Sequence, residues 1–538
     1  MRLKTLLAAI AVMASVTPTY AAEKLDSVPN FRRSSLYTFL IRSDAQDAKL
    51  DTEVVSSNLV TGLVGAVKET VKKDTAATPT VKRSELAQRQ FLNVEIPAQF
   101  NNHNLETRVL DFDKYKVTKE EVDAAALEQG VDNNSKKKKV GGFAKGLAAS
   151  ALGGSSGSQI INVDTVDKTI PAVVKKFYTE QNTAPQLVAK WFGYKDGKYD
   201  ETLELIKERG LQDASEAAKA EAGATARGDA KLMDAGQELI SNTFVLGVNL
   251  RYRSYAAIIE EAQQAANAVG SMFGSYGALA SQAAGAIANA AAGKGFAVQA
   301  YTYLYQLEWD KEKLDLFYSQ YWDKPLEELI ASGFCTLKFI GKDKAVARVS
   351  ASGFSNKKEE ELVKDAVENA IDKAIVKLQV KHEVFRTKTP IYQISEDGKS
   401  VYAQIGTKEG VAKGDEYDIL EATEEKGETV YKVIGKVKAV EGAIWNNEAG
   451  AEDAAKQAEA EGDKKAAEQL AAINLKATKF EVKKGKDLYP GLLLRLSKKK
   501  LHICLRSLHG ATADKYAVFL TICNGQNLFY NTSAYFTL

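Results

Sequence analysis

Hydrophobic and polar positions form their clearest pattern around a long run without charge. Residues 244–252 and 296–307 are rich in β-branched and aromatic side chains, and the second segment alternates with a period of two near its end. Such patterns are typical of β-strands. Between them, residues 262–293 contain no charged side chain and consist mostly of Ala, Gly, Ser and Gln. The pattern therefore predicts a strand, an inserted small-residue segment and a second strand.

The inserted segment fits two interpretations. A charge-free run of this length is typical of a transmembrane helix, but this one has few large apolar residues and several glycines, which weaken a helix in water. Gly270 and Gly274 have the GxxxG spacing that lets helices approach closely, in lipid or against protein. We expect a helical hairpin packed on its own domain or on a partner, with membrane contact as the alternative. The candidate contact residues are Gly270, Phe273, Gly274 and Tyr276.

Three further candidate interaction residues lie on one face of the second strand, namely Tyr301, Tyr303 and Tyr305. An exposed row of tyrosines could bind a glycan or a peptide, because each ring offers an apolar face and a polar tip. The alternative is that the row belongs to the half-buried face of a sheet. The spacing alone is compatible with both.

The most regular helical pattern lies at residues 357–379, where apolar side chains recur every three or four positions and form one stripe. Ser355 is placed to cap this helix, which should cover one face of a sheet. From about residue 388, short strands separated by glycine-containing turns predict a small β-barrel or sandwich. An Ala-rich, Glu-rich helical segment at 448–472 interrupts these strands.

The fold class predicted from these patterns is α+β and multi-domain, with a central α/β sandwich-like module, its helical insertion and a C-terminal small β-barrel. The expected division is a signal peptide at 1–21, an N-terminal α/β module at 22–132, a Lys/Gly/Ser linker at 133–158, a central α+β module at 159–387 with its insertion at 256–295, a β-barrel-like module at 388–500 with its helical insertion at 448–472, and an atypical tail at 501–538.

Several local elements follow from the same patterns. Residues 91–97 alternate like a strand, and Thr118 is placed to begin a helix with acidic residues in its first turn. Residues 335–340 and 345–350 are expected to form a hairpin around the turn-like residues 341–344. The tail is either a frame slip or an artificial extension, or else an extra β-hairpin whose two cysteines, Cys504 and Cys523, could pair.

Charge and targeting signals narrow the class of protein. Arg2 and Lys4 precede an apolar run and small residues, as in a secretory signal peptide, and we expect cleavage after Ala21. Its removal lowers the 72 basic residues to 70, against 70 acidic residues, so the net charge is zero and no nucleic-acid partner is expected. Three cysteines are too few for a disulfide framework, and Cys335 should be buried in a strand. We expect an exported protein of the periplasm, or one associated with the outer membrane.

No segment predicts catalytic chemistry. Residues 153–157 match the letters of GxSxG but lie in Gly/Ser-rich sequence, and Ser355 fits SxxK but is better explained as a helix cap. The histidines form no HExxH pair and no CxxC is present. They are far apart in the chain, at His103, His382, His502 and His509. We therefore expect no enzyme activity, catalytic residue, cofactor or metal site.

Part of the chain resembles known envelope proteins. The end of the 357–379 helix and residues 401–420, VYAQIGTKEGVAKGDEYDIL, resemble the end of proteins that join a curli-secretion-channel-like or flagellar-assembly-type α/β domain to a small β-barrel. The chain is also similar to uncharacterised secreted proteins of Bacteroidetes in segments 191–192, 208–210, 234–240 and 444–447. This resemblance implies no activity. The channel subunits are lipoproteins, whereas this sequence has no cysteine near the expected cleavage point.

The sequence thus predicts a non-enzymatic interaction or assembly factor at the periplasmic face of a membrane. Its expected partners are other envelope proteins or further copies of itself, with membrane contact as an additional possibility. One alternative is a membrane-inserting oligomer that uses residues 262–293. A second is a hydrolase whose carboxylate site forms only in the folded chain.

Overall fold

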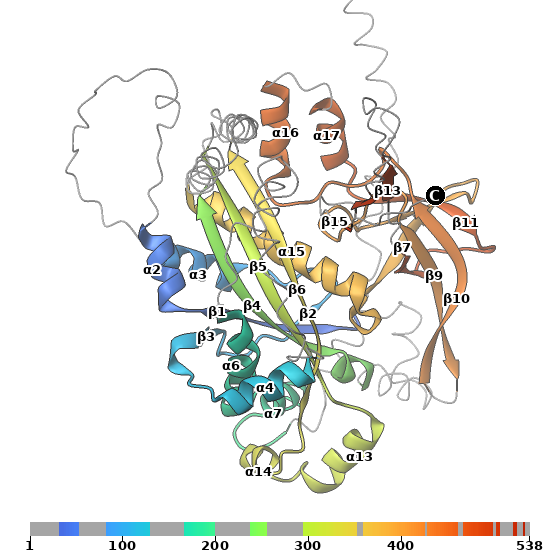
Figure 1. The fold of residues 1–538 in the computed structure, drawn as a ribbon. Coiled ribbons are helices and arrows are strands. Elements are labelled where there is room, and N and C mark those ends of the chain that lie inside the picture. Colours follow the sequence, from blue (N-terminus) through green and yellow to red (C-terminus); the bar gives the residue numbers. More distant parts are fainter. Residues whose placement is uncertain are drawn as a thin grey trace, which may run out of the picture.

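The computed structural model describes residues 32–52, 82–129, 166–199, 237–254, 294–351, 359–425, 428–460, 466–498, 502–505, 520–523 and 531–532 (Figure 1). These residues form a mixed sheet with helices on both faces and a closed six-stranded barrel. The predicted α+β, multi-domain class with a small barrel is confirmed.

The sheet joins strands from both ends of the first 351 residues. Its strand order is β2-β1-β4-β5-β6, with β3 beside β1. Strand β1 runs parallel to β2, β3 and β4, whereas β4–β5 and β5–β6 are antiparallel. The strands are β1 (Ser35–Arg42), β2 (Asn101–Asn102), β3 (Val109–Asp111), β4 (Thr243–Ser254), β5 (Lys294–Leu307) and β6 (Leu337–Ala351).

The expected N-terminal and central modules are therefore not separate. Strand β1 pairs with β4 from Ser35↔Thr243 to Ile41↔Asn249, so residues 22–132 and 159–387 contribute to one sheet. The physical reason is that β1 is buried on both faces, and its backbone groups need partners on both edges. A strand from the far side of the linker supplies one of those edges.

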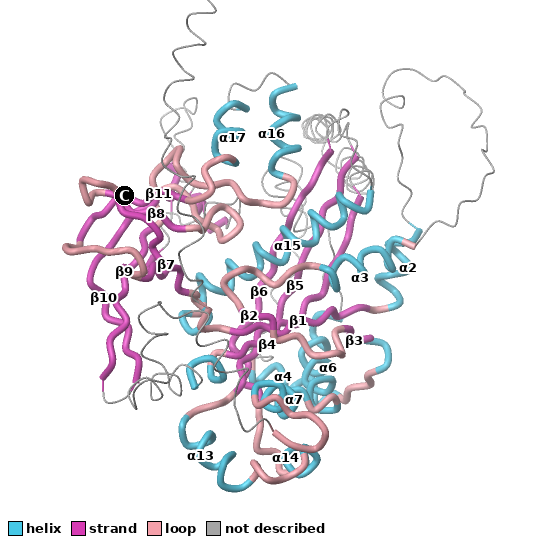
Figure 2. Tube along the Cα trace, turned by 180° about the vertical axis from the view of Figure 1, so that it is seen from behind, coloured by secondary structure: helices cyan, strands magenta, loops and turns pink. Residues whose placement is uncertain are grey.

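Helices cover the two faces of the sheet, as both views show (Figures 1 and 2). On one face lie α3 (Arg83–Asn93) and α15 (Glu359–Lys381), and α2 (Asp44–Thr52) contacts α3. The other face is covered by α6 (Val166–Glu180), α7 (Thr183–Trp191), α13 (Lys311–Gln320) and α14 (Leu326–Ala331), with α4 (Lys119–Glu128) packed on α6. A short 3-10 turn, η3 (Phe112–Lys114), follows β3.

Helix α15 fills the first core with the stripe that the sequence predicts. Its buried side chains are Leu362, Val363, Ala366, Val367, Ala370, Ile371, Ala374, Ile375 and Leu378. The helix packs on β5 and β6, whose buried residues in this core include Leu304, Ala345 and Ala347. Burying each large apolar side chain contributes about 1.5–3 kcal/mol, so this contact stabilises the helix far more than its intrinsic propensity does.

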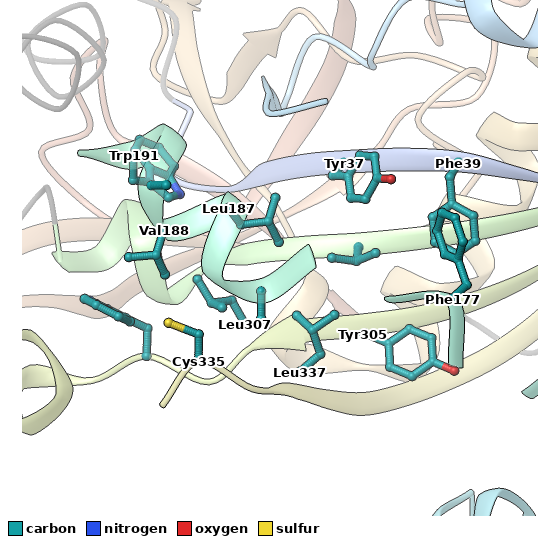
Figure 3. Packing of buried hydrophobic residues seen from close by; sticks show 14 of the residues in the cluster. Tyr37, Phe39, Phe177, Leu187, Val188, Trp191, Tyr305, Leu307, Cys335 and Leu337 are labelled. Carbon is teal, nitrogen blue, oxygen red and sulfur yellow. The ribbon is translucent and has the colours of Figure 1, made fainter. Parts of the chain in front are cut away.

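The opposite core is more aromatic (Figure 3). Tyr37 and Phe39 of β1 and Tyr305 of β5 point toward α6 and α7, where Phe177 lies 4.9 Å from Phe39 between ring centroids. Trp191 is fully buried and donates a hydrogen bond from Nε1 to the Thr243 hydroxyl at 2.8 Å. This core fixes the helices of the second layer against β1, β4 and β5.

The barrel follows α15 after one turn of 3-10 helix, η6 (Glu383–Phe385). Its strands close in the order β10-β11-β8-β7-β12-β9. They are β7 (Lys388–Ile394), β8 (Ser400–Ala403), β9 (Glu416–Glu425), β10 (Glu428–Ala439), β11 (Thr478–Lys484) and β12 (Leu493–Lys498). The predicted helical insertion contains α16 (Ala451–Ala460) and α17 (Ala466–Ile473), and α16 lies against β6 of the sheet.

Three local predictions differ from the structure. Residues 91–93 end helix α3 instead of beginning a strand, because Leu86, Ala87 and Phe91 together bury one helical face. The expected hairpin around 341–344 is one continuous strand, β6, which pairs with β5 along its length through a bulge near Leu304. The apolar pair Val384 and Phe385 also predicts a short strand in the sequence, but both residues lie in η6.

Two further predictions concern the start of helix α4 and the tail of the chain. Thr118 caps α4 in a capping box, because its hydroxyl accepts from the Glu121 amide and the Glu121 carboxylate accepts from the Thr118 amide. In the tail, β13 (His502–Leu505), β14 (Leu520–Cys523) and β15 (Asn531–Thr532) form a small antiparallel sheet. Its register places Cys504 opposite Thr521 and Cys523 opposite His502.

Candidate interaction site

The inserted segment that the sequence marks as the main interaction element is bordered by the ends of two neighbouring inner strands of the sheet, β4 and β5. Strands β4 and β5 pair from Phe244↔Gln306 to Ser254↔Phe296, so the two strand ends that border it are hydrogen-bonded neighbours. The candidate contact residues Gly270, Phe273, Gly274 and Tyr276 lie outside the described residues. The structure therefore places the attachment point of the segment, at Ser254 and Lys294.

The three candidate tyrosines are buried in the aromatic core. Tyr301, Tyr303 and Tyr305 are 9%, 4% and 2% exposed, so they do not form an open binding face. Burial, followed by the nearby Tyr178, raises the pKa of Tyr305 well above its usual value. The half-buried sheet face, which was the alternative interpretation, is closer to what the structure shows.

A polar network supports the sheet near the attachment point. The Asn249 side chain on β4 donates to the Ile41 carbonyl and to Gln46 of α2, both at 2.9 Å. Arg251, two residues further along β4, donates from Nε to Asn249 Oδ1 at 3.3 Å and lies over the Tyr301 ring at 4.2 Å from its centroid. These contacts connect β4 to its neighbours just before the inserted segment begins.

A second candidate site is the seam where α15 meets the barrel. We use the term seam for the contact between the polar face of α15 and two barrel segments, the 404–415 turn and residues 445–450. Gly410 of the turn has a φ of +74° and packs directly on Val376 of α15. Asn369 donates to the Ala449 carbonyl at 2.8 Å. Helix α15 therefore contacts the sheet with one face and the barrel with the other.

Charged side chains concentrate in the seam. Lys408 of the turn donates to Glu368 Oε1 at 2.5 Å, and its Nζ lies 3.6 Å from Asp372 Oδ2. Glu409 accepts from the Gly406 amide at 2.7 Å and from Asn447 at 2.9 Å. These groups lie on both sides of the interface, so docking of the barrel brings them together.

The pKa values of this cluster are strongly perturbed. Burial is the main cause that raises the pKa of Asp372 from 3.8 to about 7; the Lys408 ammonium opposes this rise, and the nearby Glu368 and Glu409 carboxylates add to it. Burial opposes the charge on Lys408, yet the surrounding carboxylates, first Asp372 and then Glu368, hold its pKa above the usual value. Perturbed groups that meet in one place are candidates for functional residues, although structural ion pairs perturb pKa values too.

The linker between α15 and the barrel is fixed by two consecutive residues. Phe385 is fully buried and lies against Phe100 and Phe244, with ring centroids 5.2 and 4.8 Å away. Arg386 donates to the carbonyls of Gln379 and Val380 at the end of α15, at 3.0 and 3.2 Å. These contacts satisfy carbonyl groups that the end of a helix leaves open.

A third contact between the sheet and the barrel is centred on Glu238. Glu238, in the helical residues 237–241 before β4, accepts from the Tyr431 hydroxyl at 2.7 and 2.9 Å and from Lys388 at 3.0 Å. Arg33 lies 3.8 Å from the same carboxylate. The Lys388 ammonium also lies 4.0 Å from the Tyr431 ring centroid. Glu238 thereby links β7 and β10 of the barrel to the sheet.

Among the described residues, one further group of carboxylates lies close together, beside β1 and β3. Asp44, Asp111 and Asp113 bring carboxylate oxygens within 4.8 Å of one another. Arg42 lies 3.2 Å from Asp44, and Lys114 lies 3.4 Å from Asp111, so cations offset this charge. The three aspartates therefore carry no argument for a metal ion.

The two described histidine side chains lie in different places. His103 is fully buried, contacts the Leu187 carbonyl at 3.0 Å through Nε2 and stacks on Trp191. His382 packs against Gly341 of β6, and burial lowers its pKa. Neither lies in the charged seam.

Comparisons with known proteins add no family assignment. No protein-family model and no curated protein matches the chain. Within the part of the chain that the structure describes, no helix combines the length and the apolar character that crossing a bilayer requires.

Sequence analysis did not predict the seam, although the pattern of polar residues on α15 contains one feature that indicates it. On α15, Asp365, Glu368, Asn369, Asp372 and Val376 recur at three- and four-residue spacing opposite the apolar stripe. A polar helical face of this kind is usually solvated. The exception here is Val376, an apolar residue within the polar face, which marks the point where Gly410 docks.

Proposed function

We propose that this protein is an exported, non-enzymatic interaction or assembly factor of the cell envelope, and that residues 262–293 form its docking element. The observation that carries the proposal is the β4–β5 ladder. It holds both borders of the segment side by side at Ser254 and Lys294, at one end of a sheet whose two faces are already filled by helices. Because described helices already cover both faces of the sheet, we assign this segment to contacts with other molecules.

The helical insertion of the barrel lies at the same end of the sheet as the borders of residues 262–293. Helices α16 and α17 lie near the ends of β4 and β6 in both views (Figures 1 and 2), and α16 contacts β6. Two inserted elements, 262–293 and 448–472, are far apart in the sequence and are thus carried at the same end. This arrangement supports a single recognition end, with envelope proteins or further copies of this chain as partners.

The test compares three forms of the protein expressed with the signal peptide. They are the full chain, a deletion of residues 262–293, and a variant in which these residues are replaced by a Gly/Ser sequence of equal length. Cell fractionation is followed by cross-linking and mass spectrometry, and circular dichroism checks that the sheet and barrel are retained. We expect both altered forms to remain folded and to lose the same set of cross-linked partners.

Two outcomes would contradict the proposal. If the altered forms keep every cross-linked partner, the segment is not the docking element. If the full chain sediments with membranes and both altered forms are released, the segment contacts lipid, and the membrane-inserting alternative replaces the proposed one. The equal-length replacement separates the effect of sequence from the effect of shortening the connection.

A further inference from the structure

The seam between α15 and the barrel contains more acidic than basic groups. Asp372 and Glu368 come from α15, and Glu409 comes from the 404–415 turn. All three lie around one ammonium group, that of Lys408, which donates its 2.5 Å hydrogen bond to Glu368. Asp372 is left with the ammonium at 3.6 Å, and its Oδ2 is buried without a hydrogen bond.

The other groups beside the seam do not offset this imbalance. Lys373, the next residue of α15, pairs with Glu448 of the barrel at 3.4 Å. Asn369 is neutral, and its side-chain amide donates a hydrogen bond to the Ala449 carbonyl. Only 6% of the Asp372 side chain is exposed, so water screens its charge poorly. Full ionisation would place three carboxylates against one ammonium in a buried interface, an arrangement that costs more than the ion pairs return.

We propose that protonation of Asp372 controls the docking of the 404–415 turn onto α15. With the carboxyl neutral, one ammonium faces two carboxylates, and the seam is closed. With the carboxyl ionised, repulsion from Glu368 and Glu409 and loss of hydration both favour separation of the turn from the helix. The fixed linker at Phe385 and Arg386 keeps the barrel attached while the turn moves.

The sign of the pH dependence follows from linkage. Burial, with Glu368 and Glu409, holds the pKa of Asp372 at about 7 in the closed seam, whereas an open seam returns it toward 3.8. The closed form therefore binds the proton more tightly, and raising the pH between these values favours the open form. For a single proton, the ratio of closed to open forms falls about tenfold per pH unit in this window and levels off above it.

The experiment measures amide hydrogen exchange of residues 404–415 in the full mature chain from pH 5 to pH 8. Protection factors, which correct for the intrinsic pH dependence of exchange, are compared with those of the β4–β5 ladder. In the wild type we expect protection of the turn to fall about tenfold per pH unit up to pH 7 and then to stay constant. The β4–β5 ladder should show no such change.

Three variants make the test specific. Asp372→Asn should give protection that does not depend on pH, because the titrating group is gone. Glu368→Gln should move the point at which protection levels off to lower pH, because it removes a negative charge beside Asp372 and releases Lys408 to pair with it. The control is Asp397→Asn, the same change at an exposed turn of the barrel, where the Asp397 carboxylate bonds the Ser395 hydroxyl; it should follow the wild type.

Either of two results would overturn the proposal. Wild-type protection that is constant from pH 5 to pH 8 would show that docking of the turn is not linked to a proton. A pH dependence that persists unchanged in Asp372→Asn would assign the titration to another group. If Asp372→Asn folds poorly, Glu368→Gln provides the test instead. A pH profile of Glu368→Gln that is not shifted from the wild type also contradicts the mechanism.

Discussion

The contact between Gly410 and Val376 is the most direct test of how the barrel sits on α15. Gly410 has a φ of +74°, and a Cβ added there would overlap the Cγ1 methyl of Val376 and come within 3.0 Å of Cγ2. Gly410→Ala should therefore weaken the protein twice, through its backbone conformation and through a collision with the helix. Gly414, four residues further on, has a similar φ of +81°, and its nearest neighbour would be Lys438 Cε at 3.5 Å.

These two glycines separate the two costs. A left-handed backbone costs about 1–2 kcal/mol in a residue with a side chain, and Gly414→Ala should show only that loss. Overpacking adds about 1–3 kcal/mol, so Gly410→Ala should lower the free energy of unfolding by about 2–5 kcal/mol. The difference between the two variants measures the docking contact, because the conformational term is nearly the same in both.

Urea unfolding at pH 6, followed by circular dichroism and tryptophan fluorescence, gives these free energies. A Val376→Ala partner completes a double-mutant cycle, in which the new methyl group of Ala at 410 occupies the space that the two valine methyl groups leave. In that background the cost of Gly410→Ala should fall to the value for Gly414→Ala. Equal losses for the two glycine variants in the wild-type background would refute the docked arrangement of the turn.

Three further outcomes follow from other described contacts. Phe385→Ala should lower the free energy of unfolding in urea by about 3–5 kcal/mol, because it empties a fully buried site. The control is Val384→Ala, at a residue that is 44% exposed, which should change this free energy by less than about 1 kcal/mol. Equal effects of the two variants would argue against the burial of Phe385. Burial raises the pKa of Cys335 to about 12, so in a variant without the two tail cysteines this thiol should resist Ellman's reagent at pH 8 until urea is added, and rapid native labelling would contradict its burial. Tyr431→Phe removes the hydroxyl that donates to Glu238 and should cost about 1–2 kcal/mol in the same titration, whereas an unchanged midpoint would mean that this contact adds no stability.

Sequence patterns identified the elements whose stability is local. The stripe of α15 and the capping box at Thr118 depend on residues three or four positions apart, and the short barrel strands are bounded by their own turns. The prediction failed where distant partners decide the structure. Strand β1 pairs with β4 roughly two hundred residues away, and the turn-like residues 341–344 stay extended because β5 continues to pair with them.

The candidate site divides in the same way. The position of the inserted segment between two strands followed from alternation, and β4 and β5 each extend two residues further toward the segment than expected. The burial of Tyr301, Tyr303 and Tyr305 did not follow, because alternation defines a face without saying what covers it. The charged seam was missed because Asp372 and Lys408 acquire their relation only when the barrel folds back onto the helix.

The polar character of the seam has a consequence for how the two units hold together. Interfaces between domains that separate are smaller and more polar than those that do not, and buried charges give specificity more readily than stability. The connection between α15 and the barrel, at Phe385 and Arg386, has a more apolar anchor, since the Phe385 side chain is fully buried in the core under the sheet. Helix α15 is thus bound strongly to its sheet and conditionally to the barrel turn. Any movement between the units should begin at residues 404–415, while the covalent connection stays in place.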